Sequence, residues 1–194
     1  HLSIRRQRQM CIRDSSEEDR LIDVAVVKDD DEVVLGTTQG RAIRFSVSNV
    51  RVMGRPAQGE RGIRLKDGDE VRGMAVVTEG ETLLTACQNG FGKRTVFDAY
   101  PTQGRGGQGV LDIRTTERNG PVVGLRGVSE GGEVVYITSG GQVVRSPVTE
   151  IGVIGRNTQG VRLITLKDGD ALMSIAPVVE ESIEAGEEIP RESS

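Results

Sequence analysis

The chain has 194 residues, with 25 Lys and Arg against 29 Asp and Glu, 36% hydrophobic residues and only 3% aromatic residues. This length suffices for one or two domains with a hydrophobic core, while two distant cysteines, Cys11 and Cys87, and a single histidine, His1, exclude a zinc site and a disulfide framework. No apolar run approaches the ~20 residues that span a bilayer and no secretory signal follows the N-terminus, so we expect a reduced, soluble, cytosolic protein.

The two ends of the chain differ from its middle. Residues 1–16 share no pattern with the rest, and their segment RRQRQMCIRDS resembles translated sequencing-adapter sequence, so we expect a foreign or disordered leader. Residues 17–31 resemble the last strand of a preceding repeat. Residues 180–194 carry one Lys or Arg against six Asp or Glu and are predicted to be a disordered acidic tail.

Three repeats fill the middle of the chain, and we assign them to residues 32–78, 79–128 and 129–179. The motif G-R-x-x-Q-G recurs at offsets of 50 and 51 residues, as GRPAQG, GRGGQG and GRNTQG. Before each motif a turn glycine is followed by a basic residue, in TTQGRAIRF, CQNGFGKRT and TSGGQVVRS. After it, the first and third repeats share LKDGD, which the middle repeat replaces with TTERNG. Three anchors in one order indicate a repeat architecture.

Each repeat is predicted to be all-β. Runs such as EVVLGTT and RAIRFSV are rich in Val, Ile and Thr, and the turn dipeptides DG, NG and GG close them. About four strands in ~50 residues are typical of a propeller-like blade. A closed ring normally takes about 4 to 8 blades. Three blades therefore make a partial ring or a piece of a longer protein, and their open edges predict an isolated chain that is marginally stable or self-associates.

The motifs carry a resemblance to a known family. The segments NGFGKRT, TQGRGGQGV, TTERNGPVVG and GRNTQGVRL resemble the C-terminal DNA-wrapping domain of the A subunit of bacterial DNA gyrase, over about residues 17–179. The resemblance implies a β-pinwheel, a propeller relative whose six blades exchange strands, and this chain would hold the last three.

The family's signature loop, Q-R-R-G-G-K-G, has a counterpart in QGRGGQG at residues 103–109. Five of its positions are kept: Gln103, Arg105, Gly106, Gly107 and Gly109. Gly104 stands where the signature has the first of its two arginines, at its second position, and Gln108 stands where it has lysine. We therefore interpret this box-like loop as a later-blade copy of the signature.

The resemblance also implies a role and partners. It implies nonspecific binding and bending of double-stranded DNA, in support of ATP-dependent negative supercoiling by a type IIA topoisomerase of composition A2B2. The implied partners are DNA, the N-terminal cleavage domain of the same polypeptide and the B subunit of gyrase. The implied location is the bacterial cytoplasm, at the nucleoid, and no membrane partner is expected.

No catalytic residue, metal or cofactor is expected in the chain itself, because the family's ATP and Mg²⁺ are handled by other domains or subunits. Tyr100 and Tyr136 have no neighbouring arginine or acidic cluster, and we interpret them as half-buried strand residues. The loop GRGGQGV lacks the G-K-[ST] of a P-loop.

Wrapping DNA without reading its sequence needs cations at regular intervals, and residues 33–179 carry 18 Lys and Arg against 14 Asp and Glu. A hairpin set is predicted to be exposed and to contact DNA: Arg44, Lys93, Arg94 and Arg145. A loop set is explained equally well by DNA contact and by bridges between blades: Arg55, Arg105 and Arg156. A third set follows the loops: Arg61 and Arg162.

Two acidic DGD turns, residues 67–69 and 168–170, are expected on the face away from DNA, and neither has the full loop that Ca²⁺ requires. Two alternative functions stay open. One is the C-terminal domain of the A subunit of topoisomerase IV, which steers substrate choice, and an intact upstream signature loop would separate it from gyrase. The other is a propeller scaffold that binds proteins, which the salt dependence of DNA binding would reveal.

Overall fold

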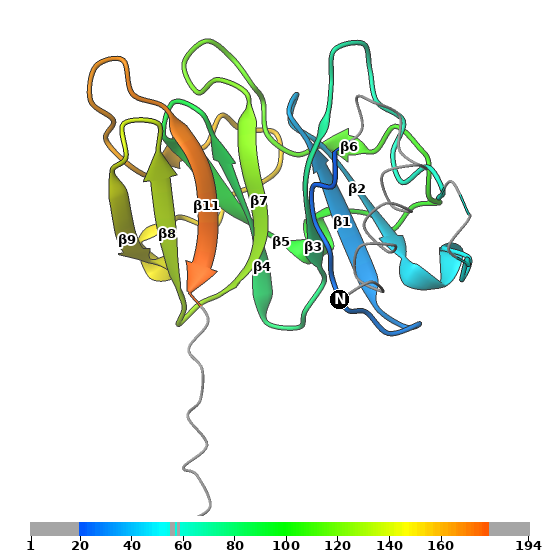
Figure 1. Cartoon of the computed structure of the whole chain (residues 1–194). Coiled ribbons are helices and arrows are strands. Elements are labelled where there is room, and N and C mark those ends of the chain that lie inside the picture. Colours follow the sequence, from blue (N-terminus) through cyan, green and yellow to red (C-terminus); the bar gives the residue numbers. More distant parts are fainter. Residues whose placement is uncertain (1–19, 55–56, 58, 179–194) are drawn as a thin grey trace, which may run out of the picture.

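The computed structural model of the chain describes residues 20–54, 57 and 59–178 (Figure 1). Within these ranges the secondary structure consists of strands and single-turn 3-10 helices. The strands are β1 Glu32–Thr37, β2 Arg41–Ser46, β3 Val71–Val76, β4 Glu81–Cys87, β5 Phe91–Val96, β6 Val110–Leu111, β7 Val122–Ser129, β8 Glu133–Thr138, β9 Val143–Pro147, β10 Val161–Arg162 and β11 Leu172–Val178. The 3-10 helices are η1 Val47–Asn49, η2 Phe97–Ala99 and η3 Val148–Glu150. The predicted all-β fold is confirmed.

Three antiparallel sheets make up the array, and the repeats exchange strands between them. The first sheet has the order β3-β1-β2-β6, the second β10-β5-β4-β7 and the third β11-β8-β9. Strand β6 belongs to the second repeat but completes the first sheet, and β10 of the third repeat completes the second. Four strands per blade therefore hold for two sheets. The third sheet has three strands in the described part of the chain.

The N-terminal segment departs from the expected strand. Residues 20–31, the described part of the predicted fragment 17–31, form no strand. Leu21, Val24 and Val26 are largely exposed. The leader 1–16 and the acidic tail 180–194 lie outside the described residues.

A glycine stands at each point where an exchanged strand meets its host sheet. Gly109 precedes β6 with φ +64°, and a Cβ placed on it would lie 2.3 Å from the carbonyl oxygen of Ala42 in β2. Gly160 precedes β10 with φ +78°, and its Cβ would lie 2.5 Å from the carbonyl oxygen of Gly92 in β5. In the second and third copies of G-R-x-x-Q-G the last glycine is thus required both by its left-handed backbone and by the close approach of two main chains.

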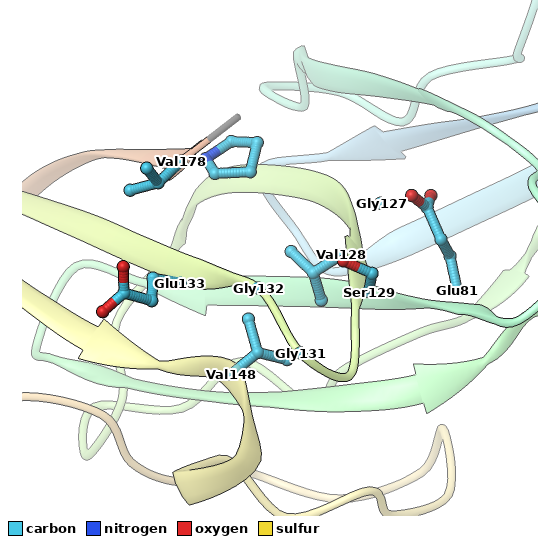
Figure 2. A pocket seen from close by; sticks show the side chains of 10 residues that line it. Glu81, Gly127, Val128, Ser129, Gly131, Gly132, Glu133, Val148 and Val178 are labelled. Atoms are coloured by element: carbon cyan, nitrogen blue, oxygen red, sulfur yellow. The ribbon is translucent and has the colours of Figure 1, made fainter. Parts of the chain in front are cut away.

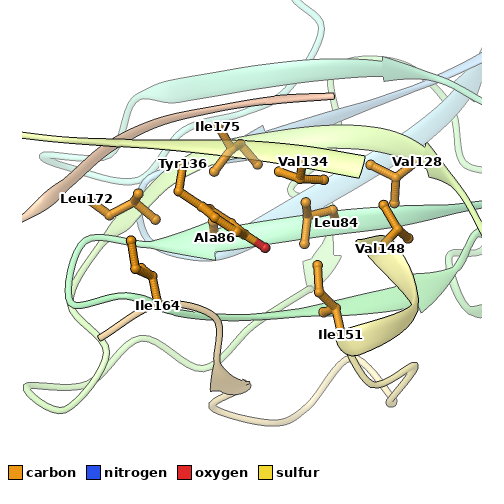
Figure 3. Close-up of a cluster of buried hydrophobic side chains, with 10 residues drawn as sticks. All are labelled: Leu84, Ala86, Val128, Val134, Tyr136, Val148, Ile151, Ile164, Leu172 and Ile175. Carbon is orange, nitrogen blue, oxygen red and sulfur yellow. The ribbon is translucent and has the colours of Figure 1, made fainter. Parts of the chain in front are cut away.

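Aliphatic cores fill the two seams between adjacent sheets. At the first seam Leu125 of β7 packs with Val34 and Leu83, and at the second seam Ile175 of β11 packs in a larger cluster (Figure 3). Tyr100 and Tyr136 are fully buried in these cores rather than half-buried. Tyr100 also follows η2 instead of lying in a strand. Strands β3, β7 and β11 lie next to one another where the sheets meet (Figure 1).

We predict that Gly109→Ala lowers the free energy of unfolding by about 2 kcal/mol or more, because a left-handed non-glycine residue and a backbone overlap both cost energy. Gly104→Ala in the same loop is the matched control, since a Cβ there meets nothing within 4 Å. It should change stability by less than about 0.5 kcal/mol. Urea unfolding followed by circular dichroism measures both, and equal losses would contradict the role given to Gly109.

Candidate nucleic-acid interface

Two arginines of the hairpin set join adjacent repeats. The Arg44 side chain is 13% exposed, and its Nη1 donates to the carbonyl of Phe97, 2.8 Å away at η2 of the next repeat. Arg94 is 3% exposed, and its Nε donates to the carbonyl of Ile151, 2.8 Å away after η3. Their carboxylate partners are Glu32 and Glu130. The prediction that Arg44 and Arg94 are exposed is wrong, because each guanidinium is used to hold the next repeat.

Lys93, also in the hairpin set, is fully buried. Its Nζ lies 2.9 Å from Oδ1 of Asp112 and 2.6 Å from Oγ1 of Thr95. Asp112 follows the exchanged strand β6 and also accepts hydrogen bonds from the hydroxyls of Tyr100 and Thr85, at 2.5 and 2.8 Å. Burial and the Asp112 charge raise the pKa of Tyr100, which therefore stays a donor. The predicted exposure of Lys93 is wrong: it neutralises a buried carboxylate at the exchanged strand.

Arg145, the third-repeat counterpart of Arg44 and Arg94, does lie at the surface. Its side chain is 57% exposed and pairs with Glu133 on the neighbouring strand. All three arginines occupy the same register, opposite Val34, Leu84 and Val135 respectively. In the described part of the chain no later repeat offers Arg145 a carbonyl, so its guanidinium stays exposed beside Glu133.

The loop set forms bridges between repeats. Nη1 of Arg105 donates to the carbonyl of Arg61 at 2.8 Å, and Nη2 lies 3.1 Å from Oε2 of Glu60, both in the first repeat. Nη1 of Arg156 donates to the carbonyl of Leu111 at 3.1 Å, in the second repeat. Of the two interpretations of this set, bridging accounts for the contacts of Arg105 and Arg156. Arg55 lies outside the described residues.

The box-like loop 103–109 also uses its backbone for the fold. The N–H of Gly106 donates to the carbonyl of Gly62 at 2.7 Å. The carbonyls of Gln108 and Gly109 accept from the guanidinium of Arg41, at 2.9 and 2.8 Å. These groups tie the second repeat to the first, so the loop connects two blades.

A pair of exposed arginines at the second seam is the feature that suits an anionic partner best. Arg162, at β10, and Arg118, in the TTERNG turn, place their Cζ atoms 5.3 and 4.7 Å from the centroid of the Phe91 ring. Neither forms an ion pair among the described residues. Guanidinium groups held on an aromatic face keep their hydrogen-bonding edges free, and such edges bind phosphate in a bidentate manner.

The turn that carries Arg118 is held in place by two asparagines. Nδ2 of the buried Asn119 donates to the carbonyls of Arg114 and Gln159, at 3.0 and 3.1 Å, and so links the second and third repeats. Nδ2 of Asn89 donates to the carbonyl of Glu117 at 2.9 Å. Arg118 is not among the cations predicted from the sequence, although one signal points to it: only the middle repeat replaces the acidic DGD turn with one that contains arginine. Arg61 is exposed as well.

The acidic DGD turns have a structural use. Oδ1 of Asp69 accepts from Oγ1 of Thr38 and N of Gln39, at 2.8 and 2.9 Å. Asp170 accepts the corresponding bonds from the third-repeat hairpin, and such bonds lower its pKa. Each aspartate therefore fixes the β-hairpin of its own blade. Among residues 20–54, 57 and 59–178, no group of three or more His, Cys, Asp or Glu side chains could hold a metal ion.

A cavity of about 490 Å³ lies beside the turn between β7 and β8 (Figure 2). Its charged lining residues are Glu81 and Glu133, so it repels rather than attracts a polyanion. Cys87 is no candidate nucleophile, because burial raises the pKa of its thiol to about 12. The described residues include no helix long and apolar enough to cross a membrane.

Comparison with known proteins agrees with an all-β architecture of three repeats. The family described as "DNA gyrase C-terminal domain, beta-propeller" matches residues 31–78, 81–129 and 132–178. The chain belongs to this family. Each matched segment holds one repeat, and together they include the arginine pair and both seams.

Several relatives of the chain are named as the A subunit of DNA gyrase. That of Pseudomonas aeruginosa is 43% identical over 174 residues, which are 90% of this chain and 19% of that protein. That of Escherichia coli K12 is 44% identical over 162 residues, 84% of this chain and 18% of that protein. The chain thus spans about a fifth of the length of these relatives.

Solved structures share the fold of this gyrase family chain. A DNA gyrase A C-terminal domain has a TM-score of 0.79 and 26% identity, and the match covers 84% of this chain and 56% of that one. The C-terminal domain of a DNA topoisomerase IV has the same TM-score, with 23% identity, and covers 84% and 51%. At that identity the second match shows the fold alone.

We predict that Lys93→Met destabilises the chain by about 3 to 5 kcal/mol, because it leaves the buried Asp112 carboxylate without its counter-charge. The double variant Lys93→Met with Asp112→Asn should recover part of the loss, since no unpaired charge then stays buried. Chemical unfolding of the single and double variants gives the coupling energy. Additive losses from the two substitutions would show that Lys93 and Asp112 act independently.

Proposed function

We propose that the chain binds and bends double-stranded DNA without sequence preference, as the C-terminal part of a DNA gyrase A subunit. The observation that carries the proposal is the exposed pair Arg118 and Arg162 at a seam of an array that belongs to the gyrase C-terminal family. In this role the chain would support ATP-dependent negative supercoiling by a type IIA topoisomerase.

In the proposed mechanism, buried cations make the array rigid and exposed cations attract DNA. Bending a short DNA segment costs several kcal/mol, so the surface that bends it must not yield. Arg44, Arg94 and the buried Lys93 fix the angle between adjacent sheets from the inside. Exposed cations then attract phosphates at the surface. Arg61 of the first repeat and Arg162 of the third occupy corresponding positions, and Arg118 lies in the middle repeat. Phosphate contacts of this kind carry affinity without sequence information.

The proposed role needs no chemistry from the chain. Among the described residues, both tyrosines are buried in the cores and Cys87 is a buried thiol. The chain would present DNA to the N-terminal cleavage domain of its own polypeptide, and the B subunit of gyrase would supply ATP hydrolysis with its Mg²⁺. A similar role in topoisomerase IV is the second candidate, favoured by the shared fold of its C-terminal domain. The 43% identity to a gyrase A subunit favours gyrase.

DNA affinity should fall steeply with salt concentration. Contact with ~5 phosphates gives a slope of about −4.5 when the logarithm of the binding constant is plotted against the logarithm of the salt concentration. Replacing both arginines of the pair, Arg118→Ala with Arg162→Ala, should lower affinity about 10-fold or more and make the slope shallower by ~2. Fluorescence anisotropy with a duplex of mixed sequence, titrated with KCl, measures both quantities.

The matched control removes two cations next to the acidic turns, Lys66→Ala with Lys167→Ala, and should change affinity less than about 3-fold. If the unaltered chain fails to bind duplex DNA at low salt, the proposal of DNA binding is wrong. If both double variants lose affinity equally, charge alone matters and the arginine pair has no special part.

Deleting residues 180–194 should strengthen DNA binding, because the segment has one Lys or Arg against six Asp or Glu and competes with phosphates for the basic surface. The gain should be several-fold in low salt and should vanish near about 0.5 M KCl, where screening is strong. The same anisotropy titration measures it. Unchanged affinity at low salt would show that the acidic segment does not oppose DNA.

A further inference from the structure

The outer face of the third sheet, on β8, β9 and β11, is not built like the faces that receive a neighbour in the first two sheets. Each of those two receiving faces has small residues where the next sheet packs against it. The register of the strand pairs identifies the corresponding positions in all three sheets, so the faces can be compared residue by residue.

At the first seam, Leu125 of the second sheet packs against two glycines. A Cβ added to Gly36 would lie 2.4 Å from Cδ1 of Leu125, and one added to Gly73 would lie 3.1 Å from the Leu125 carbonyl oxygen. Gly36 and Gly73 face each other across β1 and β3. The bulky side chain of the incoming sheet therefore sits in a hollow that exists because both host residues lack a side chain.

At the second seam the arrangement recurs with Ile175 of the third sheet. A Cβ added to Gly124 would lie 2.7 Å from Cγ1 of Ile175. Gly124 faces Ala86 across β7 and β4, as Gly73 faces Gly36. Ala86 and Ile175 share one buried cluster (Figure 3).

On the third sheet the corresponding hollow is filled. Ile137 of β8 faces Ser174 of β11, in the positions of Ala86 and Gly124. Next to them, Val143 of β9 faces Ile137, as Gly92 faces Ala86. Ile137 is 39% exposed and Val143 is 64% exposed. Two β-branched side chains and a hydroxymethyl group thus stand where the first two sheets have Gly or Ala.

We propose that the third sheet is the terminal blade of the array, closed to the docking of another blade of this kind. The incoming residue at such a seam would be the counterpart of Leu125 and Ile175, which in the first sheet is Met74. Its side chain would have to occupy the space of Ile137 and Ser174. Overpacking of this kind opposes association, and an end that refuses a further repeat keeps a repeat array from growing head to tail.

Other features of the third sheet match those of the first two sheets. The obstacle to docking is therefore confined to the three positions of the hollow. Arg145 keeps the register of Arg44 and Arg94. Gly141 keeps the left-handed backbone of Gly40 and Gly90, with φ +78°. The strand edge and the bridging arginine are therefore present, whereas the hollow for the incoming side chain is missing. The packing face of the third sheet, and not its strand edge, is therefore what prevents another blade from docking.

The test restores the hollow with residues that the chain itself uses at these positions. The variant Ile137→Ala, Val143→Ala, Ser174→Gly copies Ala86, Ala42 and Gly73. Open strand edges alone predict self-association, but because the hollow is filled we expect the unaltered 20.9 kDa chain to sediment as a monomer at 100 µM. The triple variant should at least double its weight-average mass, to about 40 kDa or more, through a head-to-tail contact. Adding Met74→Gln to the triple variant should restore the monomer.

Sedimentation velocity gives the masses, and circular dichroism melting confirms that each variant is folded. The control Met173→Ala with Val153→Ala removes exposed apolar side chains that lie outside the hollow, and it should leave the mass unchanged. Self-association of the unaltered chain that Met74→Gln abolishes would overturn the proposal. A folded triple variant that stays monomeric would overturn it as well, because the three side chains would then not be what keeps another blade away.

Discussion

The whole array depends on one constraint, the passage of an exchanged strand over the main chain of the preceding sheet. Gly109 and Gly160 make this passage possible, because their backbones are left-handed and a side chain would meet a carbonyl oxygen. Once β6 lies on β2, Asp112 is carried into the interior of the second repeat, where Lys93 and Tyr100 must satisfy it. Strand exchange thus creates the need for the buried ion pair.

The same constraint sorts the cations into two classes. Arginines that recur in the hairpins and loops lie where one repeat crosses to the next, and there they meet backbone carbonyls left without a strand partner. A buried carbonyl without a donor is costly, so these guanidinium groups serve the fold. Arg118 lies on a turn that the other repeats lack, and it is exposed. The buried arginines of the hairpins and loops are therefore structural, whereas the exposed candidates for DNA contact are Arg118, on a turn found only in the middle repeat, and Arg162, which follows its loop.

This difference explains what the sequence could reveal. The glycine and turn spacing predicts the three repeats and their strands, because those signals are local. Exposure of the hairpin cations could not be predicted in the same way. Alternation along β5 places Lys93 and Arg94 on opposite faces, and in an outer strand one face would be solvated. Here both faces are covered, one by Asp112 from an exchanged strand and the other by the next repeat. Those partners are distant in sequence.

Polarity along the array follows from the two kinds of face. Each sheet has a bulky incoming residue on one face, and the first two sheets have a hollow on the other, so sheets of this kind stack in a single direction. With Ile137 and Ser174 filling the last hollow, stacking stops at the third sheet while its outer strand edge keeps the geometry of the others. Because no seam forms beyond the third sheet, the arginine pair of Arg118 and Arg162, at the second seam, lies next to the last sheet of the array. On the DNA-binding proposal, phosphates of the bent duplex would meet these two cations at the seam next to the terminal blade.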